Sequence, residues 1–123
     1  MNLKDYIRSI QDYPKKGILF RDITTLIKNQ DAFEETINQI VDISKKFKVD
    51  KIAAIESRGF VFASAVSYIL RKPFILLRKK NKLPADVHSI DFQLEYGKAT
   101  IEVHKDSLNE NDSVLIIDDL IAT

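Results

Sequence analysis

Three short runs of apolar residues stand out along the chain, at residues 51–55, 74–77 and 114–117, and each predicts a strand. The last run has four consecutive aliphatic residues, three of them β-branched, which is typical of a strand buried on both faces. Strands of this kind occur in the middle of parallel sheets that are covered by helices. We therefore predict an α/β fold.

Three helices are predicted where apolar residues recur at helical spacing, over residues 3–10, 31–48 and 60–70. Asn2 followed by Asp5 marks the start of the first helix, and Asp31 with Glu34 forms a capping box for the second. No repeat, low-complexity tract or linker interrupts these elements. We expect one domain over residues 1–123.

A β-hairpin is predicted between the second and third runs. Residues 92–96 alternate between apolar and polar side chains like a half-buried strand, Gly97-Lys98 supplies a turn, and residues 99–104 return. If the hairpin emerges at the rim of the sheet, it is well placed to act as a lid.

The topology brings polar residues from separate strands to one edge of the sheet. The strand at 51–55, the following helix and the strand at 74–77 form a βαβ unit, which almost always makes the two strands parallel. Residues 56–59 and 78–82 then lie at the same edge. If the strand at 114–117 is parallel too, the carboxylates that follow it share that edge, where α/β sheets bind ligands.

Composition narrows the possible roles. The chain has 45% apolar and 30% charged residues, a net charge of +1 and no cysteine. Disorder is therefore not expected, and neither is a general nucleic-acid or membrane role, while thiolate catalysis and disulfides are excluded. No apolar run is long enough for a membrane span, and the N-terminus lacks the apolar core of a signal peptide, so a cytoplasmic protein is expected.

Taken one at a time, the polar residues at the rim leave alternatives open. Asp118 and Asp119 are placed to accept hydrogen bonds from hydroxyls or to lie near a cation. Arg58 lies between a strand and a helix, which suits an oxyanion but also fits a surface arginine. The basic run at 78–82 is by itself most simply a solvated loop, and the two histidines have no partner at metal-ligand spacing.

Several separated blocks resemble one family, the adenine phosphoribosyltransferases. Residues 114–123 are similar to the first ten residues of the phosphoribosyl pyrophosphate (PRPP) signature of type I phosphoribosyltransferases, which the family completes with Gly-Gly-Thr. Residues 11–22 resemble the entry block D-Y-P-x-x-G-I-L-F-R-D, and residues 54–60 match the turn that binds pyrophosphate. Residues 78–97 keep the family spacing from the basic run to Glu-Tyr-Gly without a gap.

The resemblance implies a fold and a reaction. It implies a type I phosphoribosyltransferase-like parallel sheet with flanking helices and a β-hairpin lid, with the C-terminal part missing. It also implies glycosyl transfer in purine salvage: adenine and PRPP give AMP and pyrophosphate, in a cytoplasmic homodimer. Mg²⁺ is expected through PRPP, without a direct protein ligand. A cis peptide bond is implied between Glu56 and Ser57.

Roles carry over to individual positions by the same resemblance. Phe20 and Arg21 hold adenine, and Glu95 assists proton transfer at the base while Tyr96 closes the lid. The pyrophosphate is bound by Glu56, Ser57, Arg58, Lys79 and Lys82. The ribose and its phosphate are bound by Asp118, Asp119, Ala122 and Thr123.

The incomplete phosphate motif adds an expectation of its own. The 5′-phosphate loop of the family continues beyond Thr123, so we expect a chain that ends there to have little or no transferase activity and reduced stability. Two alternatives remain: a non-catalytic regulator of the same fold that binds a purine or PRPP, and a phosphoribosyltransferase for another purine.

Overall fold

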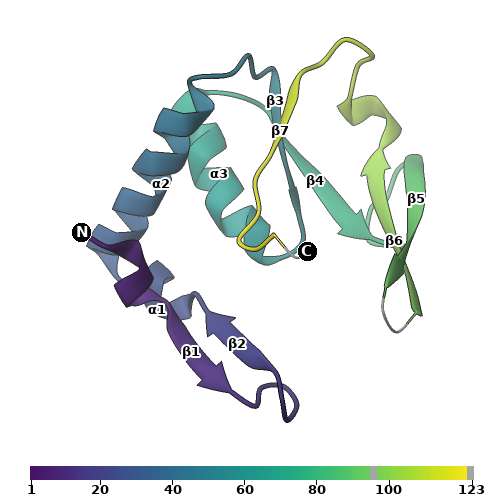
Figure 1. Cartoon of the computed structure of the whole chain (residues 1–123). Coiled ribbons are helices and arrows are strands. Elements are labelled where there is room, and N and C mark those ends of the chain that lie inside the picture. Colours follow the sequence, from purple (N-terminus) through teal and green to yellow (C-terminus); the bar gives the residue numbers. More distant parts are fainter. Residues whose placement is uncertain (95–96, 122–123) are drawn as a thin grey trace. The chain divides into compact units, whose positions relative to one another are not determined.

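The computed structural model describes residues 1–94 and 97–121 and falls into two compact units, Met1–Asp42 and Ile43–Thr123 (Figure 1). The elements of the first unit are the 3₁₀ turn η1 (Leu3–Tyr6), β1 (Arg8–Gln11), β2 (Leu19–Asp22), α1 (Thr24–Ile27) and α2 (Gln30–Ser44), whose last residues enter the second unit. Those of the second are β3 (Lys51–Ile55), α3 (Arg58–Leu70), β4 (Phe74–Lys79), β5 (Val87–Leu94), β6 (Gly97–His104), the 3₁₀ turn η2 (Lys105–Ser107) and β7 (Val114–Ile116). The single domain expected from the sequence stays a prediction.

The first unit begins differently from the prediction. A helix over residues 3–10 is wrong: Asn2 caps only the single turn η1, by accepting a hydrogen bond from the Lys4 N–H at 3.1 Å. The chain then becomes extended, and β1 pairs antiparallel with β2, with Ile10 opposite Phe20. Strand pairing with a distant segment overrides the weak helical preference of this short stretch.

Helix α2 exists as predicted but has different ends. The side-chain oxygen of Asn29 accepts the Ala32 N–H at 2.9 Å, so Asn29 rather than Asp31 caps the helix. The helix ends at Ser44, four residues before the predicted end at Lys48. The Asn29 side chain accepts one of the N–H groups that the start of the helix leaves unpaired. The predicted capping box of Asp31 and Glu34 is therefore wrong.

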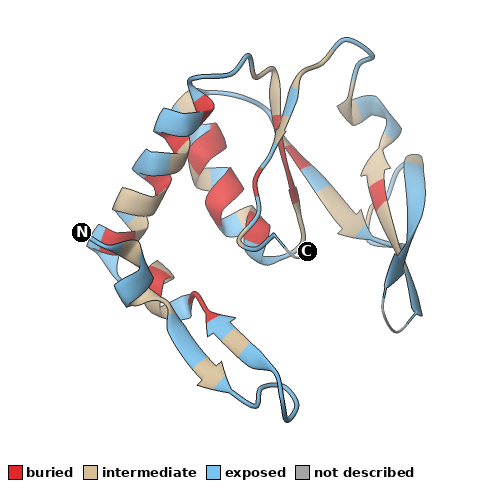
Figure 2. Ribbon diagram, viewed as in Figure 1, coloured by how far each residue is buried: buried red, intermediate tan, exposed pale blue. Residues whose placement is uncertain are grey.

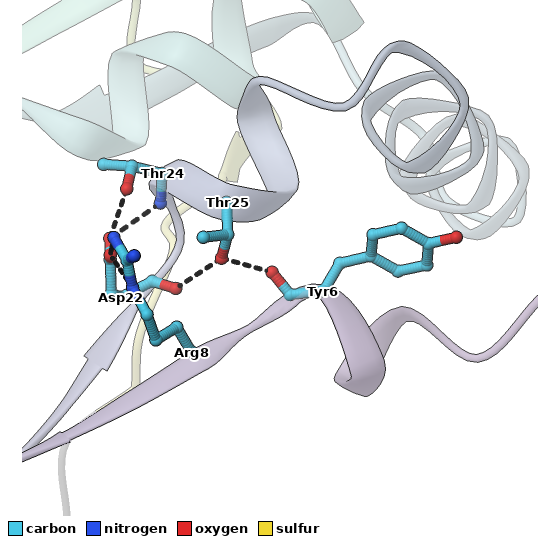
Figure 3. A network of polar contacts seen from close by, with 5 residues as sticks. All are labelled: Tyr6, Arg8, Asp22, Thr24 and Thr25. Atoms are coloured by element: carbon cyan, nitrogen blue, oxygen red, sulfur yellow. Dashed lines mark hydrogen bonds and ion pairs between the residues drawn. The ribbon is translucent and has the colours of Figure 1, made fainter.

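Asp22 joins β1, β2 and α1 through a polar network (Figure 3). Asp22 as a whole is only 6% exposed. Its carboxylate accepts hydrogen bonds from the Arg8 Nε at 2.9 Å and from the N–H and hydroxyl of Thr24 at 2.9 and 2.7 Å. The Thr25 hydroxyl donates to the Tyr6 carbonyl at 2.6 Å. The Thr24 hydrogen bonds, with those from Arg8, lower the pKa of Asp22 from 3.8 to about 2.

This lowered pKa predicts a pH-dependent contribution to stability. Because Asp22 binds a proton more weakly in the folded chain than in the unfolded one, its contribution is present above pH 3.8 and is lost as the pH falls toward 2. Urea unfolding between about pH 2 and pH 6 should show this acid loss in the unmodified chain and a smaller loss in Asp22→Asn. Asp42→Asn, at an exposed position on α2, is the control. An Asp22→Asn variant with an unaltered acid dependence would contradict the prediction.

The second unit is built on one mixed sheet with strand order β5-β6-β4-β3-β7. The three predicted strands are parallel: Ile55 of β3 pairs with Leu77 of β4, and Ala53 with Ile116 of β7. Helix α3 packs on β3 and β4. Its buried residues, drawn red in Figure 2, recur at helical spacing: Gly59, Phe62, Ala63, Val66 and Ser67. The core of this unit consists of Ile52, Ala53, Ala54, Phe62, Ala63, Val66, Ile75 and Ile117.

The predicted hairpin is confirmed, but it is longer than the pattern indicated. β5 starts at Val87 rather than Phe92, and the register pairs Leu94 with Gly97, so the predicted turn at Gly97-Lys98 is wrong because both residues belong to β6. Seven of the eight residues of β5 are exposed, and the strand is mostly pale blue in Figure 2. The pattern marked only the later part of this strand, because Val87-His88-Ser89 does not alternate between apolar and polar residues.

Candidate active site

The carboxyl ends of β3, β4 and β7 lie at one edge of the sheet, as their parallel register requires. Glu56 and Ser57 follow β3, the basic residues Arg78 and Lys79 end β4, and Asp118 follows the strand end of β7. The peptide bond between Glu56 and Ser57 is cis, as the family resemblance implied. The topology therefore brings together the sequence-predicted residues of the second unit that the structure describes.

Glu56 holds the end of β4. Its Oε1 accepts the Lys79 N–H at 2.7 Å and lies 3.3 Å from the Arg78 Nε. The backbone hydrogen bond from Lys79, aided by the charge of Arg78, lowers the pKa of Glu56 against the opposing effect of burial. Glu56 is therefore an anion whose contacts fix the basic strand end, and its predicted part in pyrophosphate binding stays a prediction.

Arg58 and Asp119 form an ion pair across the rim. The Arg58 Nε lies 2.9 Å from Asp119 Oδ2; the arginine side chain is 43% exposed and the aspartate side chain only 8%. Burial, together with the hydrogen bond and charge of Asp118, raises the pKa of Asp119, while Arg58 acts in the opposite direction. The surroundings of Asp119 disfavour its charged form, and the Arg58 guanidinium stabilises that form.

Asp118 differs from its neighbour in its surroundings. It is exposed, and its Oδ1 accepts the backbone N–H of Asp119 at 2.8 Å. A carboxylate has more acceptor sites than this one bond uses. The two adjacent carboxylates thus present one exposed anion and one that is paired with a cation.

Gly59, in the first turn of α3, makes the close packing at this rim possible. A Cβ atom at this position would lie 3.0 Å from Asp118 Oδ1 and 3.1 Å from the Ile117 carbonyl oxygen. The helix therefore approaches the carboxyl end of β7 more closely than a side chain would allow. The absence of a side chain at Gly59 brings Arg58 next to the chain that carries Asp119.

The basic loop 78–82 presents the exposed side chains of Lys79 and Lys82. Its backbone is anchored by a second carboxylate, because Glu102 of β6 accepts the Asn81 N–H at 2.9 Å. Sequence reasoning missed Glu102. The available signal was a single acidic residue inside an otherwise apolar strand segment, Ile101 to Val103.

The other predicted site residues belong to the first unit or are outside the described residues. Phe20 and Arg21 are on β2 of the first unit, where the Phe20 ring meets Tyr13 edge to face at 5.1 Å and the Arg21 guanidinium donates to the Ser9 hydroxyl. The predicted residues Glu95, Tyr96, Ala122 and Thr123 lie outside the described residues.

Within residues 1–94 and 97–121, no group of three or more His, Asp or Glu side chains is arranged to hold a metal ion. In the same ranges, no helix combines the length and apolar character that crossing a membrane requires.

Comparison with known proteins places the chain in a family. The model of the phosphoribosyl transferase domain matches residues 22–123. The adenine phosphoribosyltransferase of Pelagibacter ubique (strain HTCC1062) is 81% identical over 123 residues, which are all of this chain and 70% of that protein. The enzyme of the same name from Brachyspira hyodysenteriae is 54% identical over all of this chain and 72% of its own length.

Solved structures agree with this assignment. The crystal structure of adenine phosphoribosyltransferase from Thermoanaerobacter pseudethanolicus matches with a TM-score of 0.94 at 45% identity, over 98% of this chain and 70% of that one. The Saccharomyces cerevisiae enzyme, complexed with an imino-altritol bisphosphate and adenine, matches with a TM-score of 0.90 at 31% identity, over 98% and 70% of the two chains. Sequence and fold thus lead to one conclusion: the chain belongs to the adenine phosphoribosyltransferase family.

Proposed function

We propose that the protein transfers the 5-phosphoribosyl group of PRPP to adenine and releases AMP and pyrophosphate. The observation that carries this proposal is the 81% identity, over all 123 residues, to a protein named adenine phosphoribosyltransferase. In the reaction a bond forms between a ring nitrogen of adenine and the ribose as the bond from the ribose to pyrophosphate breaks. The protein's task is to position both ligands, stabilise the leaving anion and exclude water.

The cations at the rim are suited to the leaving pyrophosphate. Arg58 begins the 13-residue helix α3, and the exposed Lys79 and Lys82 flank the loop after β4. Guanidinium groups pair with phosphate in a bidentate manner, and a helix N-terminus adds N–H donors. In our proposal these three side chains bind pyrophosphate, with Ser57 at the start of the same helix.

The carboxylates are suited to the ribose. Asp118 is exposed and Asp119 is held by Arg58, so each can accept a hydrogen bond from a sugar hydroxyl. In our proposal they bind the 2′- and 3′-hydroxyls, with Ala122 and Thr123 toward the 5′-phosphate. Phe20 and Arg21 are proposed to hold adenine, Glu95 to assist proton transfer at the base and Tyr96 to close the lid.

Mg²⁺ fits this site as a partner of the substrate. The described residues offer no cage of three protein ligands, and Mg²⁺ is typically bound by one or two carboxylates together with substrate phosphates and water. The ion would be held through the phosphates of PRPP and water, without a direct protein ligand. When bound, it supplies charge neutralisation on the leaving group.

The proposal is tested by incubating the protein, as its own cells produce it, with labelled adenine, PRPP and Mg²⁺ and measuring labelled AMP. We expect AMP in proportion to enzyme, and little inhibition by excess guanine or hypoxanthine. Better use of another purine would favour the second phosphoribosyltransferase alternative. Saturable binding of adenine or PRPP without turnover would favour a regulator, and either result would overturn the proposal.

Two further expectations belong to the same proposal. A homodimer in the cytoplasm is tested by light scattering of the purified protein and by cell fractionation.

A further inference from the structure

Glu102 is a buried carboxylate with partners in two different segments. It lies in β6, is 7% exposed, and accepts the Asn81 N–H at 2.9 Å with one oxygen and the Ser89 hydroxyl at 2.6 Å with the other. These two hydrogen bonds, with the charge of Lys80, lower the pKa of Glu102. A carboxylate in its charged form therefore links the basic loop 78–82 to strand β5 of the hairpin.

The basic loop is held by carboxylates at two alternate amides. The Lys79 N–H donates to Glu56 at 2.7 Å, and the Asn81 N–H donates to Glu102 at 2.9 Å. Asn81 itself has a positive φ of 67°, a conformation that asparagine tolerates better than most residues. The backbone between the side chains of Lys79 and Lys82 is thus fixed from β3 and from β6.

An acidic side chain is energetically unfavourable at this buried position if its only role is to pack in the sheet. Taking a charge out of water is unfavourable, and an apolar side chain packs in a strand without that cost. A carboxylate, however, accepts two hydrogen bonds at once, and bonds to a charged acceptor are about twice as strong as neutral ones. The chemistry of Glu102 therefore fits a role in holding the loop.

We propose that Glu102 is a positioning residue for the bound pyrophosphate group of PRPP: it holds the Asn81 amide, and thereby Lys79 and Lys82, and through Ser89 it ties the loop to the hairpin. The claim that Lys79 and Lys82 bind pyrophosphate rests on the function proposed above. The claim that Glu102 holds the loop rests only on the contacts of Glu102.

The same hairpin supplies a matched control. The Thr100 hydroxyl of β6 donates to Asp91 of β5 at 2.7 Å, and this pair lies two positions from the Ser89–Glu102 pair in the strand register, with Ile90–Ile101 between them. Like Ser89 and Glu102, Thr100 and Asp91 join β5 and β6 through a hydrogen bond from a hydroxyl to a carboxylate. The Asp91 residue, however, is exposed, and its carboxylate accepts from the opposite strand instead of from a loop amide.

The experiment compares Glu102→Ala, Glu102→Gln and Asp91→Ala with the unmodified protein. In Glu102→Ala we expect the KM for PRPP and the Kd for inorganic pyrophosphate to rise about tenfold, with kcat and the KM for adenine within about twofold. Hydrogen exchange of the Asn81 amide should accelerate about tenfold as well. In Glu102→Gln the amide oxygen keeps a weaker bond to Asn81, so the changes should be about threefold. Asp91→Ala should alter none of these quantities.

Each contrary outcome is decisive. Unaltered Asn81 exchange in Glu102→Ala overturns the inference, and so does an equal rise in the KM for PRPP in Asp91→Ala, because general loosening of the hairpin then accounts for the effect. If Glu102→Ala does not fold, Glu102→Gln decides alone, since an unaltered Asn81 exchange rate in that variant overturns the inference. If the unmodified protein forms no AMP, the proposed function fails, whereas Asn81 exchange still shows whether Glu102 holds the loop.

Discussion

Replacing Arg58 with Ala is expected to lower kcat/KM for PRPP by about a hundredfold or more. The substitution removes the proposed bidentate cation at the pyrophosphate, and such preorganised charges are worth about 10²–10³ in rate. It also leaves Asp119, whose side chain is 8% exposed, without its cation at 2.9 Å. Because Arg58 opposes the rise in the pKa of Asp119, that pKa should rise further in the variant.

The control for this substitution is Arg71→Gly, at the other end of the same helix. Arg71 follows the last residue of α3 with a φ of 57°, a conformation that glycine adopts without strain. We expect its kcat/KM for PRPP to stay within about twofold, because the lost charge is distant from the rim along α3. In Arg58→Ala the acidic limb of the kcat/KM profile should move to higher pH. A loss below about tenfold, or an unmoved limb, would contradict the assignment.

Replacing Gly59 with Val should lower the free energy of unfolding by about 1–3 kcal/mol and raise the KM for PRPP. The new side chain must displace either Asp118 Oδ1 or the Ile117 carbonyl, which lie 3.0 and 3.1 Å from its Cβ position. Urea unfolding gives the stability, and PRPP titration of initial rates gives the KM. Ser64→Val, at an exposed position on the same helix, measures the cost of a β-branched residue alone.

The Gly59→Ala variant tests whether a side chain at this position raises or lowers the free energy of unfolding. Helix propensity alone predicts that Ala stabilises α3 by about 1 kcal/mol relative to Gly. The contact with the carboxyl end of β7 predicts a loss instead. A clear gain in stability would show that the helix and the chain after β7 are not held as closely as the structure indicates.

The sequence predicted the three parallel strands β3, β4 and β7 from their short continuous apolar runs. The expected burial of the last run on both faces is wrong: β7 ends the strand order of the sheet, and Val114 and Ile116 are exposed. The start of β5 was not found, because Val87-His88-Ser89 does not alternate between apolar and polar residues. The start of the chain was misassigned because the pairing of Ile10 with Phe20 depends on a segment ten residues away, which local spacing does not report.

The same distinction applies to the site. Parallel topology was enough to predict that Arg58 and the carboxylates after β7 share an edge. It did not predict that Arg58 pairs with Asp119 rather than Asp118, because side-chain partners depend on packing details such as the contact at Gly59. The roles of Glu95 and Tyr96 depend on family resemblance alone.

The ion pair between Arg58 and Asp119 has a consequence for ligand affinity, because it couples the binding of a sugar to the binding of a phosphate. Under the roles proposed for these residues, a sugar hydroxyl at Asp119 weakens the contact of Asp119 with Arg58, and a phosphate at Arg58 has the same effect from the other side. Each half of the ligand therefore lowers the cost of binding the other half, so we expect a ribose phosphate and pyrophosphate to bind with positive cooperativity. In a ligand that joins both halves covalently, the effective concentration of the second half adds to this coupling.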